Sequence, residues 1–452
     1  MSAFLDKCIP LLLLAIIVSA ALAHGAVEPW SVALCSAGLI ALPLLWALKA
    51  VLNRRLMVHL PSAVWPLAGL LLWGAAQSLT WTNQAGQRSS LSLDVEATRQ
   101  TVFSLSLLLV AFLVAANFFV SREHLAALVK FLTYYGLALA LFALLQHATW
   151  DGRFYWVRHI STEEITAPFG PFVHHGHYAG YIEMLLPFPI AMLLLRRVSS
   201  DRRFLYGAAA TVMGLSVVVS LSRGGMLSML IQLIFLGTMG YRMAREDAAY
   251  LADAAHADER SLTLKRMFSR IGVVVVIVAA IAASVVWMGA EPVLNRVLGQ
   301  ASNDNSTAES FYLNRGWIWR DALTMFRAHP LTGVGLGAFE TAFSTYTESD
   351  GSLLVAEAHN DYLQALTDGG VIGGVIVLWF VATLLRQMLQ GMRSPDPLRA
   401  ALALGAGTGV VGMLAHSFFD FNLQLPAQAL LFVLLVAVTA QCGLPARQRS
   451  TV

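Results

Sequence analysis

The sequence has few charged residues for its length. Only 13% of its 452 residues are Asp, Glu, Lys or Arg, whereas 57% are hydrophobic and the mean hydropathy is +0.65. An ordinary soluble domain carries about a quarter charged residues. The shortage of charge therefore excludes a soluble enzyme and a disordered chain, and it indicates a protein that crosses a membrane many times.

Cysteine is also scarce. The three cysteines, Cys8, Cys35 and Cys442, all lie in apolar runs. This placement excludes a disulfide framework and a thiolate metal cluster. The formal net charge of +3 is too small to indicate a nucleic-acid-binding protein, because such proteins neutralise many phosphates with Lys and Arg.

Long apolar runs predict about twelve transmembrane helices, since about 20 apolar residues are enough to cross the hydrocarbon core of a membrane. No internal repeat or linker separates the runs, so we expect an all-α, polytopic membrane protein with residues 1–452 as a single integral membrane domain. The predicted spans are 9–25, 30–50, 62–80, 101–120, 125–147, 177–195, 204–221, 226–241, 271–290, 370–390, 398–417 and 426–444.

The distribution of basic residues predicts the orientation, because Lys and Arg stay mainly on the cytoplasmic side. With a cytoplasmic N-terminus, all the lysines and most of the arginines fall in the inner segments. We therefore expect both termini in the cytoplasm and a large, partly helical outer loop over 291–369. Residues 9–23 also resemble a signal peptide, but residue 24 emerges outside whether or not this stretch is cleaved.

The outer loop is predicted to contain a helix that a capping box, Ser306-x-x-Glu309, begins and Pro330 ends. Arg315 lies in the apolar row of this helix, where a guanidinium is costly without an anion. It is therefore a candidate ligand for an anionic substrate, with a structural salt bridge as the alternative. Arg320 lies on a different stripe of the same helix.

A glycine-rich run, Gly333-x-Gly335-x-x-Ala338, follows this helix. It formally has the pattern of a dinucleotide-binding loop, but that loop needs a strand before it. Here a helix and a proline come first. We interpret the run as a tight turn that glycine permits, and we expect no nucleotide cofactor.

A polar segment precedes the tenth predicted span. If the segment is helical, Glu357, Asp361, Gln364 and Asp368 share one polar stripe, and His359 lies on the opposite row and faces the protein or the membrane surface. Imidazole titrates near neutral pH, which makes His359 a candidate general base. A packed structural histidine is the alternative.

Two further segments contain candidate residues. Arg223, in Ser222-Arg223-Gly224-Gly225, falls at the outer boundary between two spans, where an ionisable residue is a candidate for function. Three histidines, His174, His175 and His177, precede the sixth span and invite a zinc interpretation. Adjacent residues such as His174 and His175 do not converge easily, and no carboxylate or cysteine completes the set nearby. We therefore predict no metal site.

Together these motifs resemble the O-antigen ligase and O-antigen polymerase superfamily. His359-Asn360, nine residues, Gly370, two residues and Gly373 is similar to the H-[NSQ]-x9-G-x-x-[GTY] signature of O-antigen ligases and related protein O-oligosaccharyltransferases. The detailed likeness covers about 220–373. Other segments that resemble the superfamily are Ser222–Gly225, Asn314-Arg315-x-Trp317, His329-Pro330-x-x-Gly333-x-Gly335 and His416–Asn422.

The resemblance implies a glycosyltransferase of the bacterial inner membrane that works on the periplasmic face without metal or other cofactor. The donor would be a glycan linked to undecaprenyl diphosphate, and the acceptor a hydroxyl, most simply on lipid A–core. His359 would be the base, and direct attack would invert the anomeric carbon. The expected substrate-binding residues are Arg223, Arg315, Asn360, Arg320 and His177. Arginine suits a diphosphate because it binds phosphate oxygens in pairs.

Other functions stay open at this point. Within the superfamily, the protein could be a polymerase of polysaccharide repeat units or a protein O-oligosaccharyltransferase. A different class is a small-solute or bicarbonate transporter, whose sites would lie at the membrane midplane on broken helices. The expected partners are the lipid-linked donor, the glycan acceptor and membrane lipids, with no nucleic acid.

Overall fold

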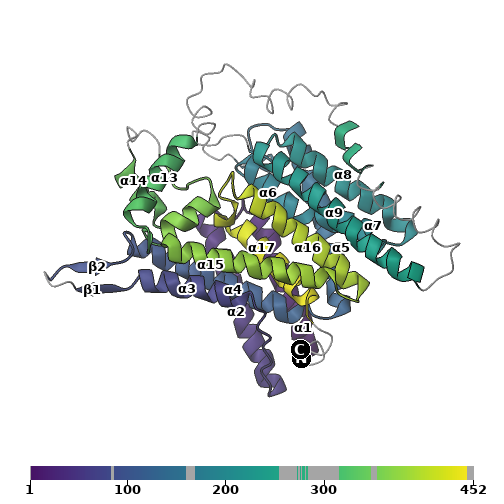
Figure 1. Cartoon of the computed structure of the whole chain (residues 1–452), viewed down its shortest axis with the longest axis horizontal. Helices are drawn as coiled ribbons and strands as arrows, with labels where there is room; N and C mark the ends of the chain where they lie inside the picture. The colour runs from purple at the N-terminus through teal and green to yellow at the C-terminus, as the bar shows by residue number, and fades with distance from the viewer. Residues whose placement is uncertain are drawn as a thin grey trace.

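The protein is described here by a computed structural model, which covers residues 2–82, 86–158, 168–253, parts of 272–283, 315–347 and 354–444. Most of the helices run along one common axis, and a short hairpin of β1 (Thr80–Thr82) and β2 (Arg88–Ser90) projects beyond one end (Figure 1). The helices are α1 (Ser2–Leu22), α2 (Pro29–Asn53), α3 (Val64–Gln77), α4 (Val95–Phe118), α5 (Arg122–Ala148), α6 (His175–Leu185), α7 (Pro187–Leu194), α8 (Arg203–Val219), α9 (Arg223–Asp253), α13 (Gly316–Ala328), α14 (Phe339–Tyr346), α15 (Asp361–Met392), α16 (Pro397–His416) and α17 (Pro426–Cys442), with short 3-10 turns η2 (Ser200–Arg202) and η4 (Asn422–Gln424).

Within the described residues, eight helical stretches are long and apolar enough to cross a membrane, namely those of α1, α2, α4, α5, α8, α9, α15 and α16. Two shorter apolar helices, α3 and α17, accompany them. The helical, multi-span class is thus confirmed. The predicted ninth span, 271–290, lies mostly outside the described residues, so the number twelve stays a prediction.

The predicted span 177–195 is two helices rather than one. α6 ends at Leu185, and Pro187 occupies the first position of α7. Proline lacks a backbone N–H and its ring collides with the carbonyl four residues earlier, so it begins a helix more readily than it continues one. The predicted span 177–195 therefore contains a break at Leu186, and its place as the sixth span stays a prediction.

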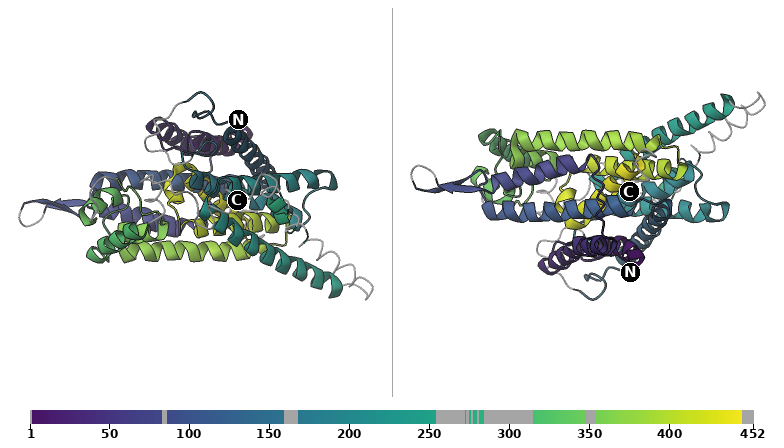
Figure 2. Two further views of the ribbon diagram at one scale, coloured as in Figure 1. Left: turned by 90° about the horizontal axis from the view of Figure 1, so that it is seen from above. Right: turned by 90° about the horizontal axis from the view of Figure 1, so that it is seen from below.

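α17 lies at the centre of the bundle. All its residues from Ala427 to Cys442 are buried, and it packs against α16, α4, α15 and α1. The pair α1 and α2 lies on one face of the remaining helices (Figure 2). A helix that is apolar on every side is one that must be surrounded by protein or lipid, and here the surroundings are protein.

α15 is kinked at Gly370, whose φ of 63° lies in the left-handed region. The kink is filled by the glycine-rich turn: the amide of Val371 donates to the carbonyl of Pro330, and that of Val334 to the carbonyl of Thr367. A Cβ on Gly370 would lie 2.3 Å from the carbonyl oxygen of Leu331. Only glycine permits this approach, so the turn holds the outer loop against the start of α15.

A second, smaller core lies beneath α13 and α14. It contains Ile318, Met325, Phe339 and Phe343, all nearly inaccessible to solvent. α13 ends at Ala328, ahead of Pro330, where the sequence predicted the end of a helix. The predicted beginning of that helix, at Ser306, lies outside the described residues.

Candidate functional site

The polar side chains of the candidate site gather around Asp420, in the loop between α16 and α17. Asp420 is 3% exposed, and its Oδ1 lies 3.6 Å from Nδ1 of His359 and 3.9 Å from Nε2 of His177. The ring of Phe421 meets both imidazoles edge-on, with ring centroids 4.8 and 4.9 Å away. Two of the candidate residues, His359 and His177, therefore face one buried carboxylate.

His359 precedes α15 rather than lying on it, so the expected helical spacing of Glu357 and His359 was wrong. Asn360 is the N-cap, and its Oδ1 accepts from the amides of Tyr362 and Leu363 at 3.1 Å each. His359 has a φ of 50°, a conformation that few residues other than glycine adopt. The cap that follows holds this conformation and directs the imidazole to Asp420.

The polar stripe of α15 also faces the protein interior. Oδ2 of Asp361 accepts from the hydroxyl of Ser417 at 2.7 Å, and Oδ2 of Asp368 accepts from the amide of Gly337 at 3.0 Å. Gln364 is 3% exposed. These side chains satisfy the backbone and side chains of the adjoining turns, which explains why a polar stripe is buried.

Arg315 is the N-cap of α13, at the beginning of the buried row that Ile318 and Ala322 continue. Its Nη1 donates to the carbonyl of Phe419, one residue before Asp420. Among the described residues, no carboxylate lies within ion-pair distance of Arg315. The guanidinium thus reaches the Asp420 loop, as an anion ligand at this site requires.

Arg223 is the first residue of α9. The two glycines after it allow the backbone of α9 to approach α6 and the end of α16 closely. A Cβ on Gly224 would lie 3.0 Å from Nε2 of His416, and one on Gly225 would lie 2.6 Å from Cβ of Ala179. The first turn of α9 therefore packs directly against α6 and the end of α16. This contact explains the two glycines of the motif and brings the beginning of α9, where Arg223 lies, to the end of α16.

Arg320 lies elsewhere on α13. Its side chain is 61% exposed, and its Nε donates to Asp321 at 2.9 Å. Asn360 has a structural task as the cap of α15. The binding roles predicted for Arg320 and Asn360 stay predictions, and their surroundings differ from the buried cluster at Asp420.

The cluster holds Asp420 in its charged form. Burial by itself raises the pKa of that carboxyl, but His359, His177, His174 and Arg315 together hold it well below its usual range. Burial, with a further contribution from His177, lowers the pKa of His174 to about 3. The site at neutral pH is therefore a carboxylate surrounded by imidazoles and one guanidinium.

His174, His177 and Asp420 are also the residues that could hold a metal ion. Each offers one ligand atom, and these atoms lie within 4.8 Å of one another. The argument that no carboxylate completes the histidine set was wrong, because Asp420 comes from a distant segment. Zinc ligands lie about 2.0–2.2 Å from the ion, so the three groups would have to draw together to bind it.

Three residues of the cluster were not among the sequence candidates: Asp420, His416 and Glu183. Glu183 is 0% exposed and His416 is 1% exposed. His416 and Asp420 belong to a run that resembled the superfamily without an assigned role. A carboxylate inside the apolar helix α6 was a further signal, since such a group needs a partner.

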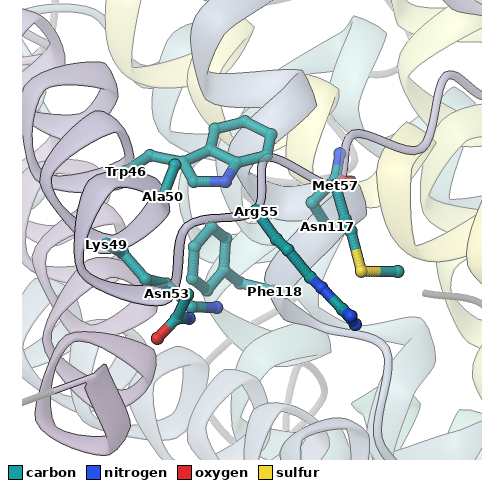
Figure 3. A pocket seen from close by; sticks show the side chains of 8 residues that line it. All are labelled: Trp46, Lys49, Ala50, Asn53, Arg55, Met57, Asn117 and Phe118. Carbon is teal, nitrogen blue, oxygen red and sulfur yellow. The ribbon is translucent and has the colours of Figure 1, made fainter.

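A groove of about 240 Å³ opens beside the cluster. Apolar side chains of α3, α4, α15 and α17 line most of it, while Asp361 and Ser417 lie at its polar part. A different cavity, of about 180 Å³, lies where α2 and α4 end and contains Lys49 and Arg55 (Figure 3). α4 begins near the outer loop, where Thr341 donates to Asp94, so this second cavity lies at the opposite end of the bundle.

The fold and the site together define a helical, multi-span membrane protein with its polar groups concentrated at one end. Residues 208–378 match the family model described as O-antigen ligase. This match confirms the resemblance to the O-antigen ligase superfamily that the motifs indicate. The matched segment includes Arg223, Arg315 and His359, but not Asp420. No match was found among curated proteins.

Proposed function

We propose that this protein transfers a glycan from undecaprenyl diphosphate to an acceptor hydroxyl on the periplasmic face of the inner membrane, as an O-antigen ligase acting on lipid A–core. The observation that carries the proposal is that His359 faces the buried carboxylate of Asp420, while Arg315 donates to the backbone carbonyl of Phe419, one residue before it. Family membership supports glycan transfer of the O-antigen ligase type.

His359 is the general base of the proposed reaction. Asp420 faces Nδ1 and favours the tautomer with its proton there, which leaves the lone pair on Nε2. Nε2 accepts the proton of the acceptor hydroxyl as its oxygen attacks the anomeric carbon. The distance of 3.6 Å between Nδ1 and Asp420 is longer than a hydrogen bond, and such contacts often tighten when substrate binds.

Arg315 and Arg223 bind the leaving diphosphate. As the new glycosidic bond forms, the bond from the anomeric carbon to the diphosphate oxygen breaks, and its electron pair moves to that oxygen. Fixed guanidiniums stabilise this growing charge. Because attack and departure occur on opposite sides of one carbon, the transfer inverts its configuration.

The apolar groove is suited to the polyprenyl tail. Its lining side chains belong to helices that are apolar enough to lie in a bilayer, and its polar part adjoins the cluster through Asp361 and Ser417. A tail in this groove would keep the diphosphate near His359 while the lipid stays in the membrane.

A transporter is less well supported. Its broken helices would line a substrate cavity at mid-membrane. The break in α15 at Gly370 is instead filled by the backbone of the turn over 330–334.

The test is a lipid and polysaccharide profile of a strain that lacks the gene. A ligase predicts accumulated lipid-linked polymer together with unmodified lipid A–core. Accumulated single repeat units would instead identify a polymerase, and loss of glycan from proteins alone would identify a protein O-oligosaccharyltransferase. An unchanged envelope would contradict all three.

A further inference from the structure

His416 and Glu183 form a second histidine–carboxylate pair, which is more deeply buried than the pair of His359 and Asp420. Nδ1 of His416 lies 3.2 Å from Oε2 of Glu183, and the two side chains are 1% and 0% exposed. An isolated carboxylate at this depth is very unfavourable, so the pair is most stable with a charged imidazolium. His416 is also the last residue of α16, where the helix dipole favours a cation.

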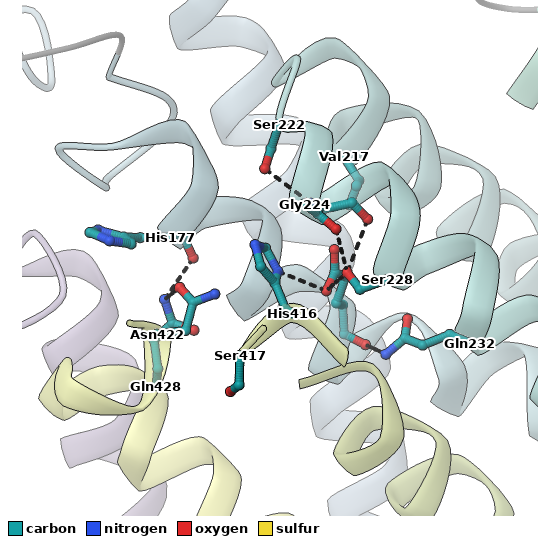
Figure 4. A network of polar contacts seen from close by, with 12 residues as sticks. His177, Val217, Ser222, Gly224, Ser228, Gln232, His416, Ser417, Asn422 and Gln428 are labelled. Atoms are coloured by element: carbon teal, nitrogen blue, oxygen red, sulfur yellow. Dashed lines mark hydrogen bonds and ion pairs between the residues drawn. The ribbon is translucent and has the colours of Figure 1, made fainter. Parts of the chain in front are cut away.

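Ser228, Gln232 and His416 hold Glu183 from different sides, and Figure 4 draws these three side chains. The hydroxyl of Ser228 donates to Oε2 of Glu183 at 2.6 Å. Nε2 of Gln232 donates to the backbone carbonyls of Glu183 and Thr408, at 3.0 and 3.3 Å. α6, α9 and α16 are thereby joined around Glu183, which fixes the position of the imidazole.

The other ring nitrogen of His416 faces the beginning of α9. A Cβ on Gly224 would lie 3.0 Å from Nε2 of His416 and 3.4 Å from Cβ of Phe419. The carbonyl of the same Phe419 accepts from Arg315. Among the described residues, the imidazole of His416 makes one hydrogen bond, through Nδ1 to Glu183, and Nε2 makes none.

Two positive groups, the guanidinium of Arg315 and the imidazolium of His416, therefore meet at the turn that follows α16, and the first turn of α9, which begins at Arg223, packs against the same turn. We propose that His416 is a third cation that binds the diphosphate of the donor, and that Glu183 is the positioning residue that keeps it charged and oriented. This inference rests on the proposed function, since it names a further contact of the same substrate.

The experiment measures binding of undecaprenyl diphosphate to the purified, full-length protein in lipid nanodiscs. His416→Gln keeps a polar side chain but removes the charge, and the affinity should fall about tenfold, as expected for one charge-assisted hydrogen bond. Glu183→Gln should cause a loss of the same size. In the His416→Gln background, Glu183→Gln should cause no further loss, because the carboxylate acts only through that imidazole.

His124→Gln is the matched control. His124 also bonds through Nδ1, to the backbone carbonyl of Phe118, but it lies at the start of α5, at the far end of the bundle. This variant should bind the lipid like the natural protein. If Glu183→Gln does not fold, Glu183→Asp replaces it, and the shorter carboxylate should weaken binding about threefold.

The possible outcomes separate the two proposals. A natural protein that does not bind undecaprenyl diphosphate would contradict the proposed function. A natural protein that binds it, together with a His416→Gln variant that binds equally well, would overturn the role of His416 alone. Additive losses in the double variant would show that Glu183 acts on the structure and not through His416.

Discussion

The site contains two histidine–carboxylate pairs that use the same chemistry in different surroundings. In the outer pair, the side chains of His359 and Asp420 are 14% and 5% exposed, and their nearest atoms lie 3.6 Å apart. In the inner pair, the side chains of His416 and Glu183 are 1% and 0% exposed and lie 3.2 Å apart. Both pairs combine an imidazole with a carboxylate and differ in exposure and separation, and this difference fits them to the two proposed roles.

A proton carrier must exchange its proton with substrate, and His359 lies on a loop beside the groove. A fixed cation must keep its proton, and Nδ1 of His416 is held by Glu183 while Nε2 faces the beginning of α9. Loss of the charge on one partner would leave the other charge buried and uncompensated, which is strongly unfavourable. The outer pair thus suits general base catalysis, and the inner pair suits binding.

The largest loss of turnover is expected from a substitution of His359. His359→Gln keeps a polar side chain without useful basicity, so turnover should fall about 10²–10⁴-fold, the usual contribution of a general base. Affinity for the donor should persist because it depends on the arginines. The measurement is the transfer rate beside donor affinity in the purified variant. Collapsed affinity with normal turnover of bound donor would make His359 a binding residue.

Asp420→Asn and Glu183→Gln together distinguish the role of the outer pair from that of the inner pair. Without the carboxylate charge, the imidazole of His359 loses its orienting partner and turnover should fall about a hundredfold. Glu183→Gln should instead weaken donor binding and change turnover at saturating donor little. Equal effects of both variants on the same kinetic parameter would remove the distinction between the pairs.

Substitutions of the two arginines test whether this site binds the diphosphate anion. Arg315→Lys and Arg223→Lys each keep a charge but lose the paired hydrogen bonds of a guanidinium, so kcat/KM should fall about tenfold or more. Membrane insertion should be unchanged, which quantification of the purified protein checks. Arg327→Lys, in the last turn of α13, is a control expected to be silent. Near-normal transfer by both site variants contradicts the diphosphate role.

Glu357 gives a smaller, pH-dependent effect near the outer pair. Burial raises its pKa to about 7, against the opposing hydrogen bond from Gln364. Between the unperturbed value of 4.5 and about 7, the folded state binds a proton that the unfolded state has lost. Stability should therefore fall as pH rises through that window. Glu357→Gln removes this contribution, and thermal unfolding at several pH values should show a shallower slope.

The smallest expected effect is that of metal removal. Arginine and imidazolium meet the diphosphate charge in the proposed mechanism, so transfer should continue in excess EDTA. Loss of activity that one specific divalent ion restores would overturn this prediction. The ion would then be assigned first to His174, His177 and Asp420, whose ligand atoms already lie close together.

Some of this site could be predicted from local patterns. Arg315 interrupts an apolar helical row, and Arg223 comes before two glycines at a span boundary, so each departs from its surroundings in a way the sequence displays. The sequence also indicates where α15 begins, because Asn360 is a preferred N-cap residue. The predicted helical spacing from Glu357 onward ignores this cap, so Glu357 and His359 were assigned to helical rows although both precede α15.

What the sequence by itself determined is the class: apolar runs separated by charged loops require a helical membrane protein, because the burial of each run depends on its own hydropathy. Only the tertiary structure decided which polar groups meet. Asp420 joins His359 and His177, and Glu183 joins His416, across long stretches of chain. Such pairs form because packed helices bring their ends together, and no periodicity within one segment records its distant neighbour.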